Sequence, residues 1–148
     1  MLSPPNNLLA KKARLRELVD IGQLGIIFPN TPLSTTRSYI KSNREALIRF
    51  LRALGEGQHR LRTDKDFSVN VLSKYTKTTD LEILGELYRI YGVRYTGQQI
   101  SYVRPEGVEE ILKGMDSKEA RQTKPADFID NSLLEEVEQT GFFRKWYR

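Results

Sequence analysis

Two clusters of hydroxyl and amide side chains have the composition of a site for a small anion. The first, residues 3–7, lies where two prolines predict the start of a helix, and the second, residues 34–38, lies on a segment predicted to be extended. Backbone N–H groups at a helix start and hydroxyl groups on an extended segment both donate hydrogen bonds to anions. A Ser/Thr-rich segment is also typical of an edge strand, so the residues by themselves leave both interpretations open.

Other residue types that carry chemistry lack the partners they would need. His59 is the only histidine, and its neighbours in a predicted helix supply neither a metal ligand set nor a group that would orient it for catalysis. The acidic residues within 109–110 and 135–138 occupy adjacent positions of predicted helices. Side chains at adjacent helix positions point in different directions, so these acids do not face one another as a catalytic pair would. We interpret His59 as a structural histidine and the acids as solvated faces, and we expect no catalytic residue, metal or cofactor.

Arginines recur along one predicted helix and could bind phosphates, as in a nucleic-acid-binding protein. Two of them follow a glutamate by four residues, Arg49 after Glu45 and Arg60 after Glu56, which is the spacing of ordinary surface ion pairs. The formal net charge is +5, and the basic excess lies in residues 1–62, where it is interleaved with acids. We expect a solvated face and no nucleic-acid partner, with a nucleic-acid-binding helical protein as a rival class.

The composition excludes several classes of protein. No cysteine occurs, so disulfides, cysteine-ligated metals and thiol catalysis are impossible. No stretch approaches the roughly 20 apolar residues of a membrane span, and neither a Walker loop nor a glycine-rich dinucleotide fingerprint occurs. Residues 1–16 lack the basic start, apolar core and cleavage site of a signal peptide, so the chain as written is expected in the cytoplasm.

The elements that would position these residues differ between the start and the rest of the chain. Its 148 residues suffice for one domain with a hydrophobic core. Prolines predict a short helix over residues 7–15 and a loop over 25–32. Alternating residues, many of them β-branched or aromatic, predict a strand over 33–40.

Capping boxes and apolar residues at helical spacing predict helices in the rest of the chain. Gly92 and Gly141 are expected to be left-handed helix stops, and Pro105 suits a first helical turn. Residues 93–103 are expected to be extended, and residues 116–124 to form a polar linker. The aromatic residues at 142, 143 and 146 should dock the tail on the core. The predicted helices span residues 43–61, 67–75, 79–91, 105–115 and 131–140.

Eight short segments resemble, in order and across nearly the whole chain, the solute-binding proteins of ABC importers of the nitrate, sulfonate and taurine class. Four lie at the start of the chain: 2–13 (LSPPNNLLAKKA), 18–20 (LVD), 24–26 (LGI) and 35–40 (TTRSYI). Four lie downstream: 50–54 (FLRAL), 71–75 (VLSKY), 127–130 (DFID) and 140–142 (TGF). Each string is unspecific alone, whereas their common order is informative.

The resemblance implies a type II periplasmic-binding fold, in which two α/β lobes enclose a ligand cleft. It implies that this chain is the carboxy-terminal part only, a truncated form of that fold. Residues 1–40 would be a remnant of the second lobe and the hinge crossover, and residues 41–148 the helical carboxy-terminal part of the first lobe. The expected fold class is therefore α/β by family and mainly α in this fragment. The parent family works in the periplasm with an ABC permease as partner.

By the same resemblance, the chain is a binding component for a small anionic organic solute and not an enzyme. Ser3 would lie at a strand end facing the cleft, and Thr35 and Thr36 on the crossover between the lobes. Together with Asn6, they supply hydroxyl and amide donors that suit an oxyanion near a helix start. Arg37 is a further candidate, although strand alternation would place it opposite Thr36.

Two alternatives stay open, namely a cytoplasmic ligand-sensing effector domain of the LysR type, which shares the fold, and a gene remnant that binds nothing or assembles only with a partner chain. Pyrimidine-precursor synthases of the same family are excluded, because their cysteine-rich motif cannot exist here. Self-association is expected through apolar surface that the other lobe would cover. The residues in need of such a counter-surface are Leu47, Phe50, Leu51 and Leu54.

Overall fold

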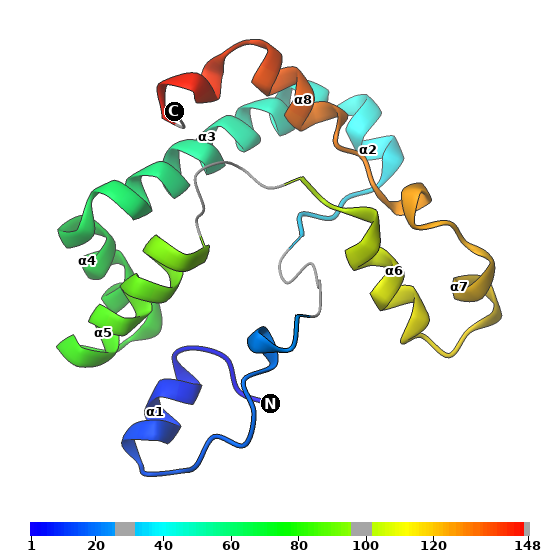
Figure 1. The fold of residues 1–148 in the computed structure, drawn as a ribbon. Coiled ribbons are helices and arrows are strands. Elements are labelled where there is room, and N and C mark those ends of the chain that lie inside the picture. Colours follow the sequence, from blue (N-terminus) through cyan, green and yellow to red (C-terminus); the bar gives the residue numbers. More distant parts are fainter. Residues whose placement is uncertain (26–31, 96–101, 147–148) are drawn as a thin grey trace. The chain divides into compact units, whose positions relative to one another are not determined.

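Helices make up the regular structure of the protein (Figure 1). The computed structural model describes residues 1–25, 32–95 and 102–146, and within these ranges no strand occurs. The prediction that this chain is mainly α is therefore confirmed. The α/β arrangement of the parent family stays an expectation.

The helices are short, apart from one of 20 residues. The α-helices of the described residues are α1 (Asn6–Lys12), α2 (Arg37–Ser42), α3 (Arg44–Thr63), α4 (Lys65–Thr76), α5 (Leu81–Tyr88), α6 (Pro105–Lys113), α7 (Lys118–Gln122) and α8 (Ser132–Gln139). Short 3-10 or π-helical segments also occur: η1 (Ile21–Gln23), η2 (Arg89–Tyr95), η3 (Pro125–Phe128) and η4 (Phe142–Lys145). Of these segments η2 is a π-helix and the others are 3-10 helices.

The chain divides into two compact units that share helix α3. The first unit comprises residues 1–20, 53–100 and 146–148, and the second comprises residues 21–52 and 101–145. Neither unit is one continuous stretch of sequence. The division into lobe remnants at residue 40 rests on the resemblance and stays a prediction.

One apolar face of α5 forms the core of the first unit. Ile83, Leu84 and Leu87 are buried, and Leu87 has no exposed surface. Their spacing places them on one side of the helix, where each buried side chain contributes about 1.5–3 kcal/mol. Helix α4 and the η2 turn pack against α5. The partly buried residues around this core cluster are Leu8, Val69, Leu72 and Tyr91.

Helix α8 supplies much of the core of the second unit. Leu133, Leu134 and Val137 are buried, and Val137 is fully enclosed. Helix α8 packs against η4, and α6 packs against α7 and η3. The other buried apolar residues of this unit are Ile48, Ala120 and Phe143.

Most predicted helix boundaries after residue 43 agree with the structure. Asp64 caps α4, because its carboxylate accepts a hydrogen bond from the Phe67 N–H at 3.1 Å. Pro105 is the first residue of α6. Gly141 follows α8 with a φ of 71°, the left-handed stop that its sequence position predicts. Phe143 behind it is buried, as expected for a docked aromatic tail.

The predicted strand over residues 33–40 is wrong, because Arg37–Ser42 form helix α2. Thr36 is its N-cap, and its hydroxyl oxygen accepts a hydrogen bond from the Tyr39 N–H at 3.2 Å. Strand preference depends strongly on context, and here the local cap outweighs it. Strand alternation therefore no longer bears on Arg37, the first residue of α2.

Two further boundaries differ from the prediction for local reasons. Helix α1 ends at Lys12 and not at residue 15, because Arg14 adopts a φ of 61° and the Leu15 N–H donates back to the last turn of the helix. The predicted linker over residues 116–124 contains helix α7. This helix forms because the hydroxyl of Ser117 accepts a hydrogen bond from the Ala120 N–H at 3.0 Å.

Gly92 does not stop a helix, contrary to the prediction. Helix α5 ends at Tyr88, and the following π-helical turn η2 runs through Gly92, whose φ is not positive. A Cβ atom added at Gly92 would lie 2.8 Å from Cε2 of Tyr88 and 3.1 Å from the carbonyl oxygen of Leu61. The position therefore requires glycine because two other parts of the first unit approach it closely.

The predicted inward face of α3 is only partly covered. Leu47, Leu51 and Leu54 are half-buried, Ile48 is buried, and Phe50 is 49% exposed. Self-association through this face stays a prediction. The predicted loop at residues 26–31 and the predicted extended residues 96–101 lie outside the described residues, whereas residues 93–95 belong to η2.

Candidate functional site

Ser3 and Asn6 lie at the amino-terminal end of α1 in the first unit. The carbonyl of Ser3 accepts a hydrogen bond from the Asn7 N–H at 3.3 Å, and Pro5 is the N-cap residue. Ser3 and Asn6 are exposed, so their side chains are accessible to a solute. Oδ1 of Asn7, by contrast, is buried and has no hydrogen-bond partner among the described residues.

Thr35 and Thr36 precede α2 in the second unit, and both are exposed. The Thr36 hydroxyl caps α2 and lies 3.0 Å from the hydroxyl of Ser38, with which it shares a hydrogen bond. Arg37 contacts a different element, because one Nη atom donates to the backbone carbonyl of Asp127 at 2.5 Å. The hydroxyl cluster is therefore present at a helix start, while Arg37 is engaged with η3.

The structure brings Ser3 together with Asn6, and Thr35 together with Thr36. Each pair stands at the start of a short helix within its own unit. Helices of six or seven residues align few peptide groups, so side-chain donors more than the helix dipole would hold an anion at either place. That the two pairs form one site stays a prediction.

A polar cluster that the sequence did not reveal joins α3 to α8 in the second unit. Arg44 donates to Oε2 of Glu136 from Nε at 3.0 Å and from Nη2 at 2.5 Å. Asp130 accepts hydrogen bonds from the N–H and the hydroxyl of Ser132 at 3.0 and 2.6 Å. These bonds, together with the nearby charges of Arg44 and Arg37, hold the pKa of Asp130 below its usual value. Arg44 and Glu136 form an ion pair that links α3 to α8, and Asp130 is hydrogen-bonded to Ser132, so these contacts are structural.

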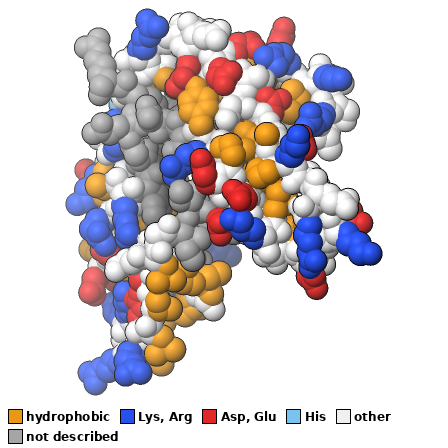
Figure 2. Space-filling model, turned by 45° about the vertical axis from the view of Figure 1, so that its right-hand side comes forward, with side chains coloured by type: hydrophobic (Ala, Val, Ile, Leu, Met, Phe, Trp, Pro, Cys, Tyr) orange, Lys and Arg blue, Asp and Glu red, His pale blue; other side chains and the backbone are white. Residues whose placement is uncertain are grey.

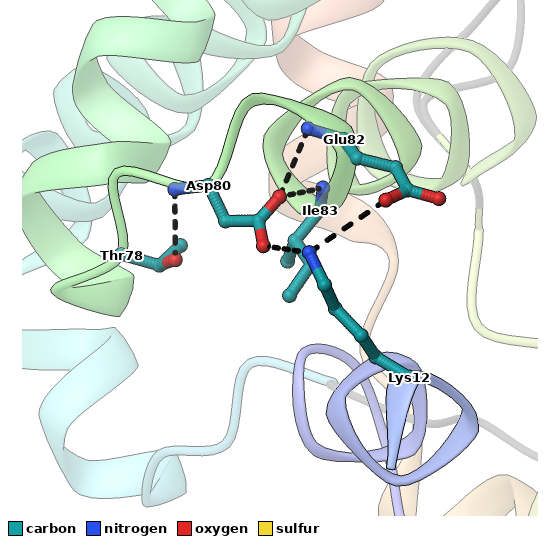
Figure 3. Close-up of polar contacts among 5 residues, drawn as sticks. All are labelled: Lys12, Thr78, Asp80, Glu82 and Ile83. Carbon is teal, nitrogen blue, oxygen red and sulfur yellow. Dashed lines mark hydrogen bonds and ion pairs between the residues drawn. The ribbon is translucent and has the colours of Figure 1, made fainter. Parts of the chain in front are cut away.

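Asp80 joins α5 to α1 in the first unit (Figure 3). One carboxylate oxygen caps α5 by accepting hydrogen bonds from the N–H groups of Glu82 and Ile83 at 3.1 and 3.3 Å. The other accepts a hydrogen bond from the ammonium of Lys12, which also lies 3.6 Å from the Glu82 carboxylate.

The Lys12 hydrogen bond is the main reason that the pKa of Asp80 lies below its usual value, and it raises the pKa of Lys12. The helix predicted over residues 79–91 begins two residues later, at Leu81, because Asp80 is the N-cap of α5. Lys12 was not predicted at all. It lies 68 residues away, and a long-range ion pair leaves no local pattern in a sequence.

The arginines of α3 contact other groups of the protein. Arg49 lies 3.7 Å from Glu45, as predicted, whereas Arg60 pairs with Asp64 at 3.5 Å and not with its predicted partner Glu56. Figure 2 shows basic and acidic side chains interspersed over the drawn face. These contacts favour a solvated, internally paired surface over a phosphate-binding stripe. The remaining partners are Glu136 for Arg44, the ring of Phe142 for Arg52 and the carbonyl of Trp146 for Arg62.

His59 packs against Trp146 in the first unit. The two ring centroids lie 4.6 Å apart with the ring planes inclined by 53°, and both side chains are half-buried. In the described ranges, no group of three or more histidine and acidic residues could hold a metal ion. The ring contact supports the interpretation of His59 as a structural residue.

Two shallow hollows lie on the first unit, and both are open to solvent. The hollow beside α4 and α5 has a volume of about 400 Å³ and is lined by Lys65, Asp66, Val69, Asn70, Leu81 and Gly85. The hollow between α1 and α5 has a volume of about 330 Å³ and is lined by Leu8, Lys11, Lys12, Glu82, Ile83 and Glu86. Ligand sites usually enclose most of the ligand surface, which open hollows do not. The four predicted ligand residues line neither of them.

No family model, curated protein or solved structure matches this chain. Among the helices of the described ranges, none combines the length and the apolar character that crossing a membrane requires. What the chain does must therefore be inferred from its own residues.

Proposed function

We propose that this chain supplies the carboxy-terminal part of a solute-binding protein, which captures a small anionic organic solute and delivers it to the permease of an ABC importer. The observation that carries the proposal is the common order of eight segments that resemble the nitrate, sulfonate and taurine class, from residues 2–13 to residues 140–142. One short match arises easily by chance, so the proposal rests on the common order of all eight. The proposal involves binding and no chemical reaction.

The helices of the downstream part support the proposal. Residues 50–54 lie inside α3, and residues 71–75 lie inside α4. Residues 127–130 lead from η3 toward α8, and residues 140–142 follow α8. The resemblance implies a helical carboxy-terminal part, and the described residues have one.

The chemistry of the exposed donors also supports the proposal. Hydroxyl and amide groups at Ser3, Asn6, Thr35 and Thr36 can donate hydrogen bonds to an oxyanion, whose charge strengthens each bond. The Thr36 oxygen accepts from the Tyr39 N–H and shares a hydrogen bond with the Ser38 hydroxyl, so Thr36 can donate its proton to a solute when Ser38 is the donor of that shared bond. Arg37 is bonded to the Asp127 carbonyl, so we leave it outside the proposed site.

Ligand-observed NMR on the chain tests the proposal, because it detects even millimolar affinity, about 4 kcal/mol of binding free energy. The probes are taurine, ethanesulfonate and ethylamine, which share a two-carbon skeleton. Taurine and ethanesulfonate carry a sulfonate, and ethylamine carries none. We expect saturation transfer from the protein to the two sulfonates and none to ethylamine. Equal transfer to all three probes, or no transfer to any, would count against an anion-binding function.

The Thr35→Val variant separates solute binding from helix capping, because Thr35 caps no helix and valine has nearly the same shape. Loss of one hydrogen bond to the charged solute costs about 1.5–3 kcal/mol, or roughly 13–160-fold in affinity. Thr36→Val would also remove the α2 cap, so Thr36→Ser, which keeps the hydroxyl, is its control. Unchanged affinity in Thr35→Val would remove Thr35 from the site and leave the proposed function standing.

A further inference from the structure

Helix α1 is fastened within the first unit by contacts at its two ends and one apolar side chain. Before the helix, the hydroxyl of Tyr91 donates to the carbonyl of Pro4 at 3.3 Å. At its last residue, Lys12 donates to Asp80 (Figure 3). Between these two points, Leu8 packs against the core cluster of α5.

These contacts hold α1 weakly. The helix has seven residues, none of them buried, whereas an isolated helix needs about 12–15 residues to be even marginally stable in water. The side chains of Lys12 and Asp80 are 52% and 29% exposed, and exposed ion pairs contribute little to stability. Oδ1 of Asn7 is buried without a partner among the described residues, which opposes docking. Local opening of α1 should therefore require less free energy than unfolding of the unit.

The surface beneath α1 matches it in charge and in the position of an apolar residue. We call the surface formed by Glu82, Ile83 and Glu86 the α5 groove, and it lines the hollow of about 330 Å³ between the two helices. On α1, an apolar residue and two lysines stand at positions i, i+3 and i+4 and share one helix face. On α5, Ile83 lies between two acidic residues four positions apart. A helix with one leucine and two following lysines is thus the occupant that this groove fits.

The connection behind α1 carries apolar side chains without cover. Residues 13–20 form a turn followed by a segment with no helix. In this segment Leu15, Leu18 and Val19 are 65%, 83% and 57% exposed. Apolar surface of this kind favours association with another apolar segment.

We propose that the α5 groove accepts α1 from a second copy of this chain, so that two copies exchange their amino-terminal helices. The exchanged dimer makes the Lys12 and Leu8 contacts between copies instead of within one, which is why exchange costs little. In addition, the two connections run beside each other and cover their exposed apolar residues. Within one copy the tether raises the effective concentration of α1, so exchange in the unchanged protein requires high protein concentration.

A pair of charge-reversed variants tests the exchange, because it disfavours the contact of α1 with the groove of its own copy. The first variant carries Lys12→Glu, which places an acid at position 12 next to the carboxylates of Asp80 and Glu82. The second carries Asp80→Asn and Glu82→Lys, which replaces the two acids beside Lys12 with a neutral amide and an ammonium, while asparagine keeps the acceptor that caps α5. In each variant residue 12 meets a like charge at position 82 within one copy, whereas residue 12 of each variant is opposite in charge to residue 82 of the other.

Sedimentation equilibrium measures the outcome as mass. We expect each variant alone at the 17.1 kDa of the single chain and an equimolar mixture at twice that mass. The combined variant with all three substitutions, in which the charges match again within one copy, should stay at the single-chain mass. Its circular dichroism should equal that of the unchanged chain, which shows that the substitutions permit folding.

A mixture that stays at the single-chain mass would overturn the exchange. Dimers of each variant alone, as abundant as in the mixture, would overturn it as well, because charge would then not select α1 as the occupant. If a variant alone loses helix content, mixing it with the other variant still tests the exchange. Recovery of helix content together with doubled mass supports exchange, and failure to recover contradicts it.

Discussion

The close approach to Gly92 predicts a specific loss of stability in the variant Gly92→Ala. The added methyl group would lie 2.8 and 2.9 Å from two ring carbons of Tyr88 and 3.1 Å from the carbonyl oxygen of Leu61. Carbon atoms attract one another best at about 3.5–4.0 Å, so both ring contacts are much too short, and the contact with the carbonyl oxygen is tight. The ring cannot simply turn away, because the Tyr88 hydroxyl donates to the carbonyl of Arg62 at 2.8 Å.

The expected magnitude combines two opposing effects. Forcing a methyl group into a packed site typically costs about 1–3 kcal/mol. Replacing glycine by alanine also restricts the unfolded chain, which by itself would stabilise the protein by about 0.4–1 kcal/mol. We therefore expect Gly92→Ala to lower the free energy of unfolding by about 1–2 kcal/mol, measured by urea denaturation with circular dichroism.

Two other glycines provide matched controls. Gly57 in α3 and Gly85 in α5 both have open space where a Cβ would stand, so alanine there should raise the free energy of unfolding by about 0.5–1 kcal/mol. In a Tyr88→Ala background the penalty of Gly92→Ala should shrink, since the ring is gone. A Gly92→Ala variant as stable as Gly85→Ala would show that the position does not require glycine for packing.

The remaining predictions concern the core and a tyrosine. Leu87 has no exposed surface, so Leu87→Ala should lower the free energy of unfolding by about 2–5 kcal/mol. Leu81 is 79% exposed, so Leu81→Ala should change it by less than about 0.5 kcal/mol. Equal effects of the two variants in urea denaturation would contradict the assigned core. Burial and a hydrogen bond to Glu138 raise the pKa of Tyr102 from 10.0 to about 12, so the unfolded chain releases this proton first and stability should fall as the pH rises through this window. Tyr102→Phe should make that fall shallower in urea midpoints measured across the same window, and an identical slope would argue against the raised pKa.

Several helix boundaries could be predicted from the sequence because they depend on neighbouring residues. The helix predicted over residues 43–61 is α3, Arg44–Thr63, and Asp64, Pro105 and Gly141 act as the cap, first residue and stop that their types indicate. Each of these signals acts over fewer than about five residues, within the span of a helix-capping hydrogen bond. The helical character of the chain follows from such signals.

The wrong predictions arose where two local signals competed or where a distant group intervened. Residues 33–40 have the composition of a strand, but the hydroxyl of Thr36 starts a helix instead. Ser117 does the same in a segment whose polarity suggested a linker. Gly92 has the type of a helix stop, yet its need for glycine comes from the ring of Tyr88, four residues earlier, and from the carbonyl of Leu61, which lies far away in sequence.

For the candidate site, the sequence by itself determined the kinds of groups available, namely hydroxyl and amide donors near residues 3–7 and 34–38, because residue type alone sets what can donate a hydrogen bond. Only the tertiary structure decided which charged groups meet. Lys12 reaches the Asp80 carboxylate across 68 residues and Arg44 reaches the Glu136 carboxylate across 92, while Arg37 reaches the backbone carbonyl of Asp127 across 90. Such contacts depend on how the helices pack through their apolar faces, so no spacing in the sequence predicts them.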